Sequence, residues 1–217
     1  MSKPDARTKL LDAAIELVRA QGYAATTVDE LCRKAGVTKG AFFHHFESKD
    51  ALAVSAANYW SETTSGLFAG APYHDHEDPL DRVLAYVDFR RALLEGTPAE
   101  FTCYAGTTVQ ETFASNDDIR AACKASIFGH ADTLVADIAD AMRKYKVKDN
   151  WTAQSLALHT QAVLQGAFVL AKATGSAAIA VESADHLRRY IELLFNRKPT
   201  ASSRVTRARP HHRSHDA

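Results

Sequence analysis

Apolar residues along this chain recur with the spacing of α-helices, and the alternation typical of strands is hard to find. From about Asp5 to Gln21, the side chains of Leu10, Ala14 and Val18 fall on one helical face. Much later, residues 70–79 are rich in turn residues and are expected to form a loop. The pattern predicts an all-α fold, with later helices at about 79–95, 99–114, 117–145, 151–173 and 183–197.

Two short helices are expected between the first helix and a longer one. Thr27 and Glu30 form a capping-box pattern that opens the first, and Gly36 ends it. Thr38 caps a second, very short helix, and Ser48 opens a helix that runs to about Phe68. A helix, a tight turn with glycine and a second short helix are the parts of a helix-turn-helix, here at 27–46.

The second short helix combines large rings with very small residues. Phe42 and Phe46 stand four positions apart and are expected to pack inward. Small side chains on another face let a backbone approach the floor of a DNA major groove, and neighbouring cations and hydroxyls suit phosphates and base edges. The candidate DNA contacts are Thr27, Thr38, Lys39, Gly40, Ala41, His44, His45 and Lys49. The alternatives are a solvated polar face for the histidines and a helical protein-interaction module without DNA binding.

The stretch TTVDELCRKAGVTKGAFFHHFESKDAL, at 26–52, resembles the signature of the TetR family of transcriptional regulators. The preceding AAIELVRAQGYAATTV, at 13–28, is similar to the first helix of that family. The resemblance is strong over 4–64 and is only a helical pattern beyond. Phe43 stands where the family usually has tyrosine, so a phosphate-contacting hydroxyl is absent, although the ring can still pack; Phe43 joins the candidate DNA contacts.

This resemblance implies a homodimer that binds double-stranded operator DNA. The DNA-binding domain would comprise 4–64, and a larger helical domain at 65–197 would bind an unidentified small-molecule effector and form the dimer. Effector binding is expected to move the helix after Ser48 and release the DNA, as a repressor does; the sign of regulation is not in the residues. Operator, effector and regulated genes stay open.

Two late helices are candidates for the dimer interface. No charged residue occurs from Trp151 to Ala171, so that helix needs cover on several sides. The last helix carries an apolar stripe, and two such helices from each subunit would form a four-helix interface. The predicted interface residues are Leu187, Ile191, Leu194 and Phe195. The alternative is that both helices form the core of a monomer.

Aromatic and polar residues of the middle helices are candidates for the effector pocket, with core packing as the alternative for each. Cys103 is in addition a candidate sensor of oxidants or electrophiles, although a buried, inert thiol is the other interpretation. The candidates are Phe68, Phe89, Phe101, Cys103, Tyr104, Thr107, Phe128, His130, His159 and Phe168.

Composition narrows the remaining classes. The 217 residues hold 26 basic and 26 acidic side chains, so any DNA binding depends on where charge is placed. No GxSxG, HExxH, P-loop or dinucleotide motif is found, which argues against an enzyme or a cofactor. Three dispersed cysteines suggest a reducing cytoplasm, and no membrane association or metal site is expected. The arginine-bearing tail, 198–217, is expected to be disordered.

Overall fold

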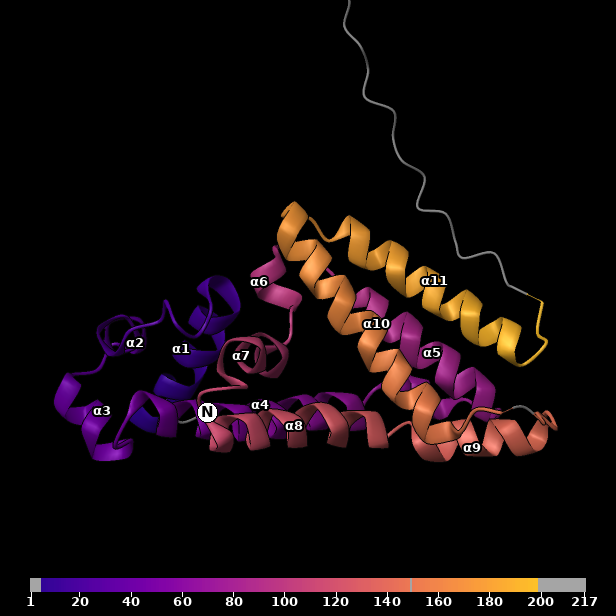
Figure 1. The fold of residues 1–217 in the computed structure, drawn as a ribbon, viewed down its shortest axis with the longest axis horizontal. Coiled ribbons are helices and arrows are strands. Elements are labelled where there is room, and N and C mark those ends of the chain that lie inside the picture. The colour runs from indigo at the N-terminus through magenta and orange to yellow at the C-terminus, as the bar shows by residue number, and fades with distance from the viewer. Residues whose placement is uncertain (1–4, 149, 199–217) are drawn as a thin grey trace, which may run out of the picture.

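The computed structural model describes residues 5–148 and 150–198, and within these ranges the secondary structure is helical, without strands (Figure 1). This confirms the all-α prediction. The helices are α1 (Ala6–Gln21), α2 (Val28–Ala35), α3 (Lys39–His45), α4 (Lys49–Ala69), the 3-10 turn η1 (Pro72–Asp75), α5 (Pro79–Ala92), α6 (Pro98–Phe101), α7 (Tyr104–Thr112), α8 (Asp117–Asp132), α9 (Val135–Lys144), α10 (Ala153–Thr174) and α11 (Ala178–Leu194).

Side-chain caps set the boundaries of the first helices. Asp5 accepts a hydrogen bond from the Thr8 amide at 2.7 Å, and Thr27 and Glu30 form the expected capping box of α2. Gly36 ends α2 with φ +65°, a left-handed conformation that glycine adopts without a steric penalty. Because Thr38 caps α3 directly afterwards, the chain has room for only a short turn between α2 and α3.

One apolar core joins α1–α3 to helices much later in the chain. Phe42 and Phe46 are buried in it with Leu10 and Leu31. The same cluster includes residues of α7 and α8, such as Tyr104. Helix α4 runs from this core along α8 into the second half of the molecule (Figure 1). The predicted domain boundary at 64/65 therefore falls within a continuous helix, and the division into two domains stays a prediction.

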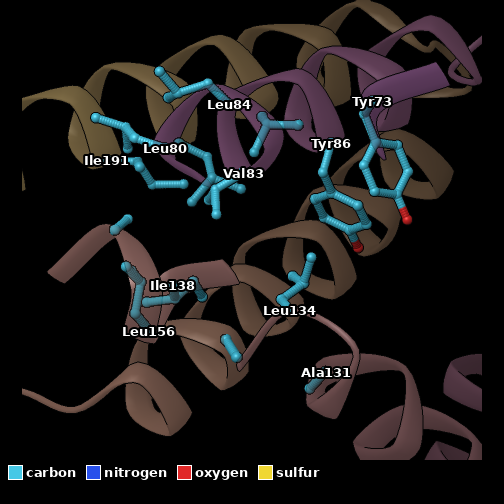
Figure 2. Packing of buried hydrophobic residues seen from close by; sticks show 14 of the residues in the cluster. Tyr73, Leu80, Val83, Leu84, Tyr86, Ala131, Leu134, Ile138, Leu156 and Ile191 are labelled. Atoms are coloured by element: carbon cyan, nitrogen blue, oxygen red, sulfur yellow. The ribbon is translucent and has the colours of Figure 1, made fainter. Parts of the chain in front are cut away.

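A second core lies at the other end of the molecule, between α5, α9, α10 and α11. Leu80, Val83, Ile138, Leu156 and Ile191 converge there, as Figure 2 shows. Burying aliphatic and aromatic side chains from four helices fixes the position of α5 against α9 and α11. This end also supplies one wall of the cavity described below.

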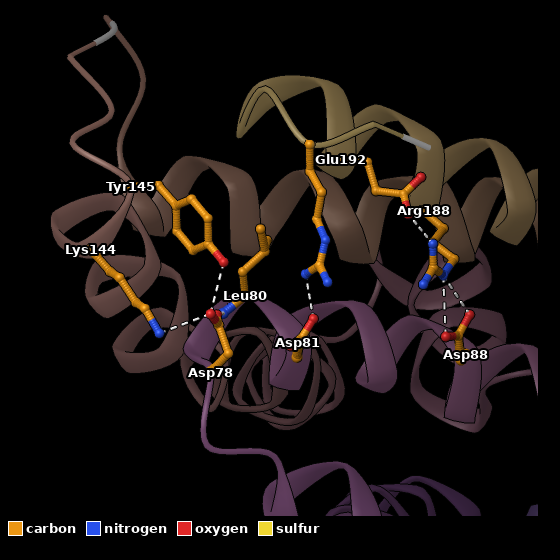
Figure 3. A network of polar contacts seen from close by, with 9 residues as sticks. Asp78, Leu80, Asp81, Asp88, Lys144, Tyr145, Arg188 and Glu192 are labelled. Carbon is orange, nitrogen blue, oxygen red and sulfur yellow. Dashed lines mark hydrogen bonds and ion pairs between the residues drawn. The ribbon is translucent and has the colours of Figure 1, made fainter. Parts of the chain in front are cut away.

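Polar contacts secure the ends of α5 against its neighbours (Figure 3). Asp78 caps α5 by accepting a hydrogen bond from the Leu80 amide at 2.8 Å, and it also contacts Tyr145 Oη at 2.7 Å and Lys144 Nζ at 2.9 Å. Burial would raise the pKa of Asp78, but these three donors outweigh it and hold the pKa at about 2. Further along α5, Asp88 accepts from Arg188 Nε at 2.9 Å.

Several helix boundaries differ from those predicted. The segment 99–114 is interrupted by extended backbone at Thr102, after which Cys103 caps α7. The segment 117–145 breaks after Asp132, where the Leu134 amide bonds to the Ala131 carbonyl with three-residue spacing instead of four. Helix α11 begins at Ala178, five residues before the predicted position 183.

No helix within the described ranges combines the length and apolarity that crossing a membrane would require. Residues 199–217, which hold nearly all of the predicted basic tail, lie outside the described residues.

Candidate DNA-binding surface and internal cavity

Helix α3 has a buried side and an exposed side. Phe42 is fully buried, and the edge of the Phe43 ring packs on it with centroids 5.1 Å apart. Lys39 and Gly40 are exposed and Ala41 is partly exposed, although the Ala41 amide is capped by Thr38 Oγ1 at 3.1 Å. The helix is thus supported from behind by rings and open on the flank that carries the smallest residues.

Lys39 is not free of partners on this surface. Its Nζ lies 2.6 Å from Asp29 Oδ1 of α2, and this hydrogen bond raises the pKa of Lys39. Both side chains are more than half exposed, so the ion pair is weak and a phosphate can replace the carboxylate.

The remaining rings of α3 leave one side free. His44 is exposed and Phe43 is 57% exposed, whereas His45 is half-buried. The two imidazoles meet edge to face, with centroids 5.0 Å apart. His44 therefore presents its ring to solvent beside the small residues.

Two predicted phosphate contacts are engaged within the protein. Lys49 Nζ donates to the carbonyls of Tyr23 at 3.1 Å and Thr26 at 3.0 Å, and it lies 4.2 Å from the centroid of the Tyr23 ring. In the structure this ammonium is turned inward and ties α4 to the loop after α1, and its contact with a phosphate stays a prediction. Thr27 is exposed, but its hydroxyl accepts from the Glu30 amide in the capping box.

A cavity of about 360 Å³ lies where α1, α4, α5, α6, α8 and α10 meet. A volume of this size suits a small organic molecule. Its walls are largely aromatic and aliphatic, with a few polar side chains among them. Five of the predicted effector residues line it: Phe68, Phe101, Cys103, His130 and Phe168.

The other five predicted effector residues do not line this cavity, and their role in effector binding stays a prediction; Thr107 lines a second cavity of about 230 Å³ next to Cys103 and Phe168. Tyr104 is buried in the core with α1–α3 and donates to the Ala53 carbonyl at 3.3 Å. Phe89 packs behind Phe68 with ring centroids 5.6 Å apart. Helical spacing alone does not tell which of the aromatic residues face a cavity. The remaining three are Thr107, which accepts from Lys172 Nζ at 2.8 Å; Phe128, which is 43% exposed; and His159, which stacks on Tyr190.

The cavity also contains charged residues that sequence reasoning missed. Arg19 comes from α1 and Arg90 from α5, and both line the cavity. Each continues an apolar stripe: Arg19 stands four positions after Ile15, and Arg90 four after Tyr86. The sequence could have pointed to both arginines, because each is a cation on the otherwise apolar face of a helix. Other lining residues that were missed include Trp60, Glu100, Gln161 and Gln165.

A polar network connects the cavity to the second core. Tyr86 Oη lies 2.8 Å from His130 Nε2 and accepts from Gln161 Nε2 at 3.0 Å. Arg90 Nη1 is 3.1 Å from the same His130 nitrogen. Because a guanidinium only donates, Nε2 acts as an acceptor and the imidazole is neutral. Burial, and then the charge of Arg90, lower the pKa of His130 to about 3.

Cys103 is a half-buried free thiol at the edge of this cavity. Its Sγ accepts from the Gly106 amide at 3.3 Å and so caps α7. The thiol therefore has a structural task, and its predicted role as a sensor stays a prediction.

The apolar stripe of α11 faces inward. Leu187, Ile191 and Phe195 are buried in the second core, and Leu194 is partly buried against it. The chain itself already covers these side chains, and their predicted use between subunits stays a prediction. The outward side of α11 carries Tyr190 and Leu193, which are 43% and 64% exposed.

Helix α3 is short, follows a tight turn and is supported by buried rings, as in a helix-turn-helix protein. One long helix, α4, joins it to a separate cavity that is large enough for a ligand. Two family models match: "Bacterial regulatory proteins, tetR family" at residues 10–56 and "Transcriptional regulator LmrA/YxaF-like, C-terminal domain" at 79–186. The chain belongs to the TetR family of transcription regulators, whose members are not enzymes.

Individual relatives agree with this assignment. The chain is 28% identical to the regulator LmrA of Bacillus subtilis over 131 residues, which are 57% of this chain and 65% of LmrA. It thus spans just under two thirds of the length of that relative. A TetR regulator structure from Chloroflexus aurantiacus matches with a TM-score of 0.73 at 27% identity, over 86% of this chain and 93% of that one. A TetR-family structure from Agrobacterium tumefaciens has a TM-score of 0.75 at 19% identity, over 85% and 96% of the two chains.

Proposed function

We propose that this protein is a transcriptional regulator that binds double-stranded operator DNA as a homodimer and is released, as a repressor, by a small organic effector. The observation that carries the proposal is the open flank of α3, where Lys39 and Gly40 are exposed in front of the buried Phe42. A helix with such small side chains on its exposed flank fits a major groove, about 12 Å wide, without steric obstruction.

On this surface we assign different tasks to neighbouring residues. Gly40 and Ala41 let the backbone of α3 approach the floor of the major groove, and Lys39 and His44 contact phosphates or base edges. The amide end of α3, next to Thr38, adds to the attraction for a phosphate. Phe43, His45 and Thr27 border the contact, and Lys49 supports it from inside.

The homodimer is proposed on the outward faces of α10 and α11. His159 of α10 and Tyr190 of α11 stack with centroids 5.1 Å apart, so the two helices share one outward surface. Leu170 and Leu193 add exposed apolar area to it. Exposed small residues along α10, including Ala162 and Gly166, let a second copy approach closely. A two-fold dimer of this kind repeats one surface on both subunits.

Helix α4 is the proposed link between effector and DNA. It begins at Lys49, directly behind α3, and its later turns contribute Trp60, Leu67 and Phe68 to the cavity. A molecule that enters the cavity displaces α4, and α3 moves with it. Since the α3 helices of the two subunits must enter major grooves about 34 Å apart, a small displacement weakens binding.

We place the DNA-binding domain at 4–64, the effector and dimer domain at 65–197, and the protein in the cytoplasm with its DNA.

Selection of genomic fragments on the purified protein tests this function. Enriched fragments should share a sequence with two-fold symmetry, and Lys39→Ala and His44→Ala should abolish their retention while the dimer persists. Lys124→Ala, an exposed lysine of α8, is the matched control and should bind normally. Affinity should fall steeply with salt, because phosphate binding releases counterions. Normal binding by both α3 variants, or binding without salt dependence, would favour the protein-interaction module instead.

A further inference from the structure

Two arginines line the cavity without an acidic partner. Among the described residues, neither Arg19 nor Arg90 forms an ion pair with a carboxylate. Buried or half-buried guanidinium groups are usually paired, because an uncompensated charge loses its hydration. The missing partner is therefore a feature of this cavity that needs an explanation.

Arg19 shows the deficiency most clearly. Its guanidinium stacks over the Trp60 ring at 5.0 Å, and its Nε is buried without any hydrogen-bond partner. Burial lowers the pKa of Arg19, although the group stays charged. A planar donor that is buried beside a cavity, fixed by a ring and left unsatisfied can receive an oxygen from a bound molecule.

Arg90 is held in place only by neutral groups. Its Nη1 lies 3.3 Å from Tyr86 Oη and 3.1 Å from His130 Nε2, and its guanidinium lies 5.3 Å from the centroid of the Phe68 ring. Since His130 is neutral and Tyr86 carries a hydroxyl, these contacts orient the guanidinium without cancelling its charge.

Glu100 is the one carboxylate among the lining residues. It accepts from the Thr97 amide at 2.6 Å and from Thr97 Oγ1 at 2.8 Å, and it is exposed. This carboxylate thus caps α6 in contact with solvent, and it acts on Arg19 only through space, without an ion pair. The charged lining consequently carries one positive charge in excess, between walls that are mainly apolar.

We propose that the cavity binds an organic anion, an aromatic or aliphatic carboxylate, whose charge is held by Arg19 and Arg90. The proposal rests on the proposed effector function of the cavity and names its ligand class. A carboxylate matches the fork of guanidinium donors, and the apolar walls suit a hydrocarbon body. Because Arg19 belongs to α1, the anion contacts the DNA-binding region directly, and its effect on DNA does not depend on α4 alone.

Matched pairs of acids and amides test the ligand class without knowledge of the natural effector. Benzoate, 2-naphthoate and decanoate are compared with benzamide, 2-naphthamide and decanamide by thermal shift and by quenching of tryptophan fluorescence, to which Trp60 in the cavity wall and the distant Trp151 both contribute. At least one acid should bind about tenfold more tightly than its amide, as expected for charge-assisted hydrogen bonds. Equal or better binding by the amides, or no binding by any acid, overturns the proposal.

Variants locate the anion. Arg19→Gln and Arg90→Gln should each remove the preference for the acid, whereas Arg120→Gln, at an exposed arginine of α8, should keep it. Preference that survives both cavity substitutions overturns the assignment. The melting temperature of each variant without ligand shows whether it is folded. The comparison of acids with amides on the wild-type protein does not depend on the folding of any variant. DNA binding without ligand tests the proposed function separately, so a protein that selects DNA but does not prefer acids refutes the ligand class alone.

Discussion

Lys39 and Asp29 face each other across the turn between α2 and α3, with 2.6 Å between Nζ and Oδ1. DNA must compete with Asp29 for this lysine, and the carboxylate also repels phosphates. Asp29→Asn should therefore tighten binding to both selected and unrelated DNA, by about fivefold at moderate salt. Fluorescence anisotropy with labelled duplexes measures the change.

A suitable control for that experiment is Asp117→Asn, which removes an exposed carboxylate of α8 that is 83% exposed. It leaves the turn between α2 and α3 unaltered and should change affinity little. If Asp29→Asn weakened DNA binding, the position assigned to Lys39 on the DNA-facing flank would be wrong.

Lys49 offers a second test at the scale of a residue, because sequence and structure give it different tasks. The structure satisfies its ammonium with two carbonyls and the Tyr23 ring. Lys49→Met should thus lower the free energy of unfolding by about 2 kcal/mol, which urea denaturation measures. Lys124→Met should have little effect. Unchanged stability with lost DNA binding would restore the phosphate contact predicted from the sequence.

At the scale of elements, α5 is held at its first turn by the charge of Asp78. The pKa of this carboxyl is lowered to about 2, so its contribution to stability is complete above pH 4 and is lost as the pH falls toward 2. Asp78→Asn keeps an N-cap side chain but removes the charge that pairs with Lys144. The variant should be less stable than the wild type by about 1–2 kcal/mol at pH 6.

The difference between wild type and Asp78→Asn should narrow as the pH falls below about 4, because the carboxyl of the unfolded wild type then binds a proton while the folded one, with its pKa of about 2, still resists protonation. Thermal unfolding at several pH values follows it. A difference that stays constant from pH 6 to pH 3 would mean that packing or capping, rather than charge, links α5 to α9.

The first helices were predictable because their boundaries are local. The predicted caps at Thr27, Thr38 and Ser48 act within three residues, and the structure confirms all three; it adds a cap at Asp5. The break before Leu134 was missed, because the sequence from His130 to Leu134 contains no proline or glycine, and the nearby Gly129 lies within α8.

The candidate sites were predictable to different degrees for the same reason. On α3, the helical positions of the small residues, Gly40 and Ala41, and of Phe42 already separate an exposed side from a buried one. The cavity instead depends on how six helices pack, so only five of the ten predicted effector residues line it and Arg19 was overlooked. In α11, the apolar stripe indicated burial correctly, but it does not say whether the covering helix belongs to the same chain.

At the scale of the whole molecule, the proposed dimer places two copies of α3 on one DNA duplex. Leu193→Arg puts a charge on the outward face of α11, where the native leucine is 64% exposed. The variant should be a folded monomer by light scattering, with DNA affinity reduced by about a hundredfold or more because only one half-site is bound. Phe113→Arg, at a phenylalanine that ends α7 and is 58% exposed, is the control and should remain dimeric. A dimeric Leu193→Arg protein would place the interface elsewhere.

The most direct test of the account is methylation interference on a selected DNA fragment, because dimethyl sulfate modifies guanine in the major groove and adenine in the minor groove. If α3 of each subunit enters a major groove, methylated guanines should block binding in two segments about 34–36 Å apart, on one face of the duplex. Interference confined to adenines, or none, would contradict the central claim that the exposed flank of α3 lies in the major groove.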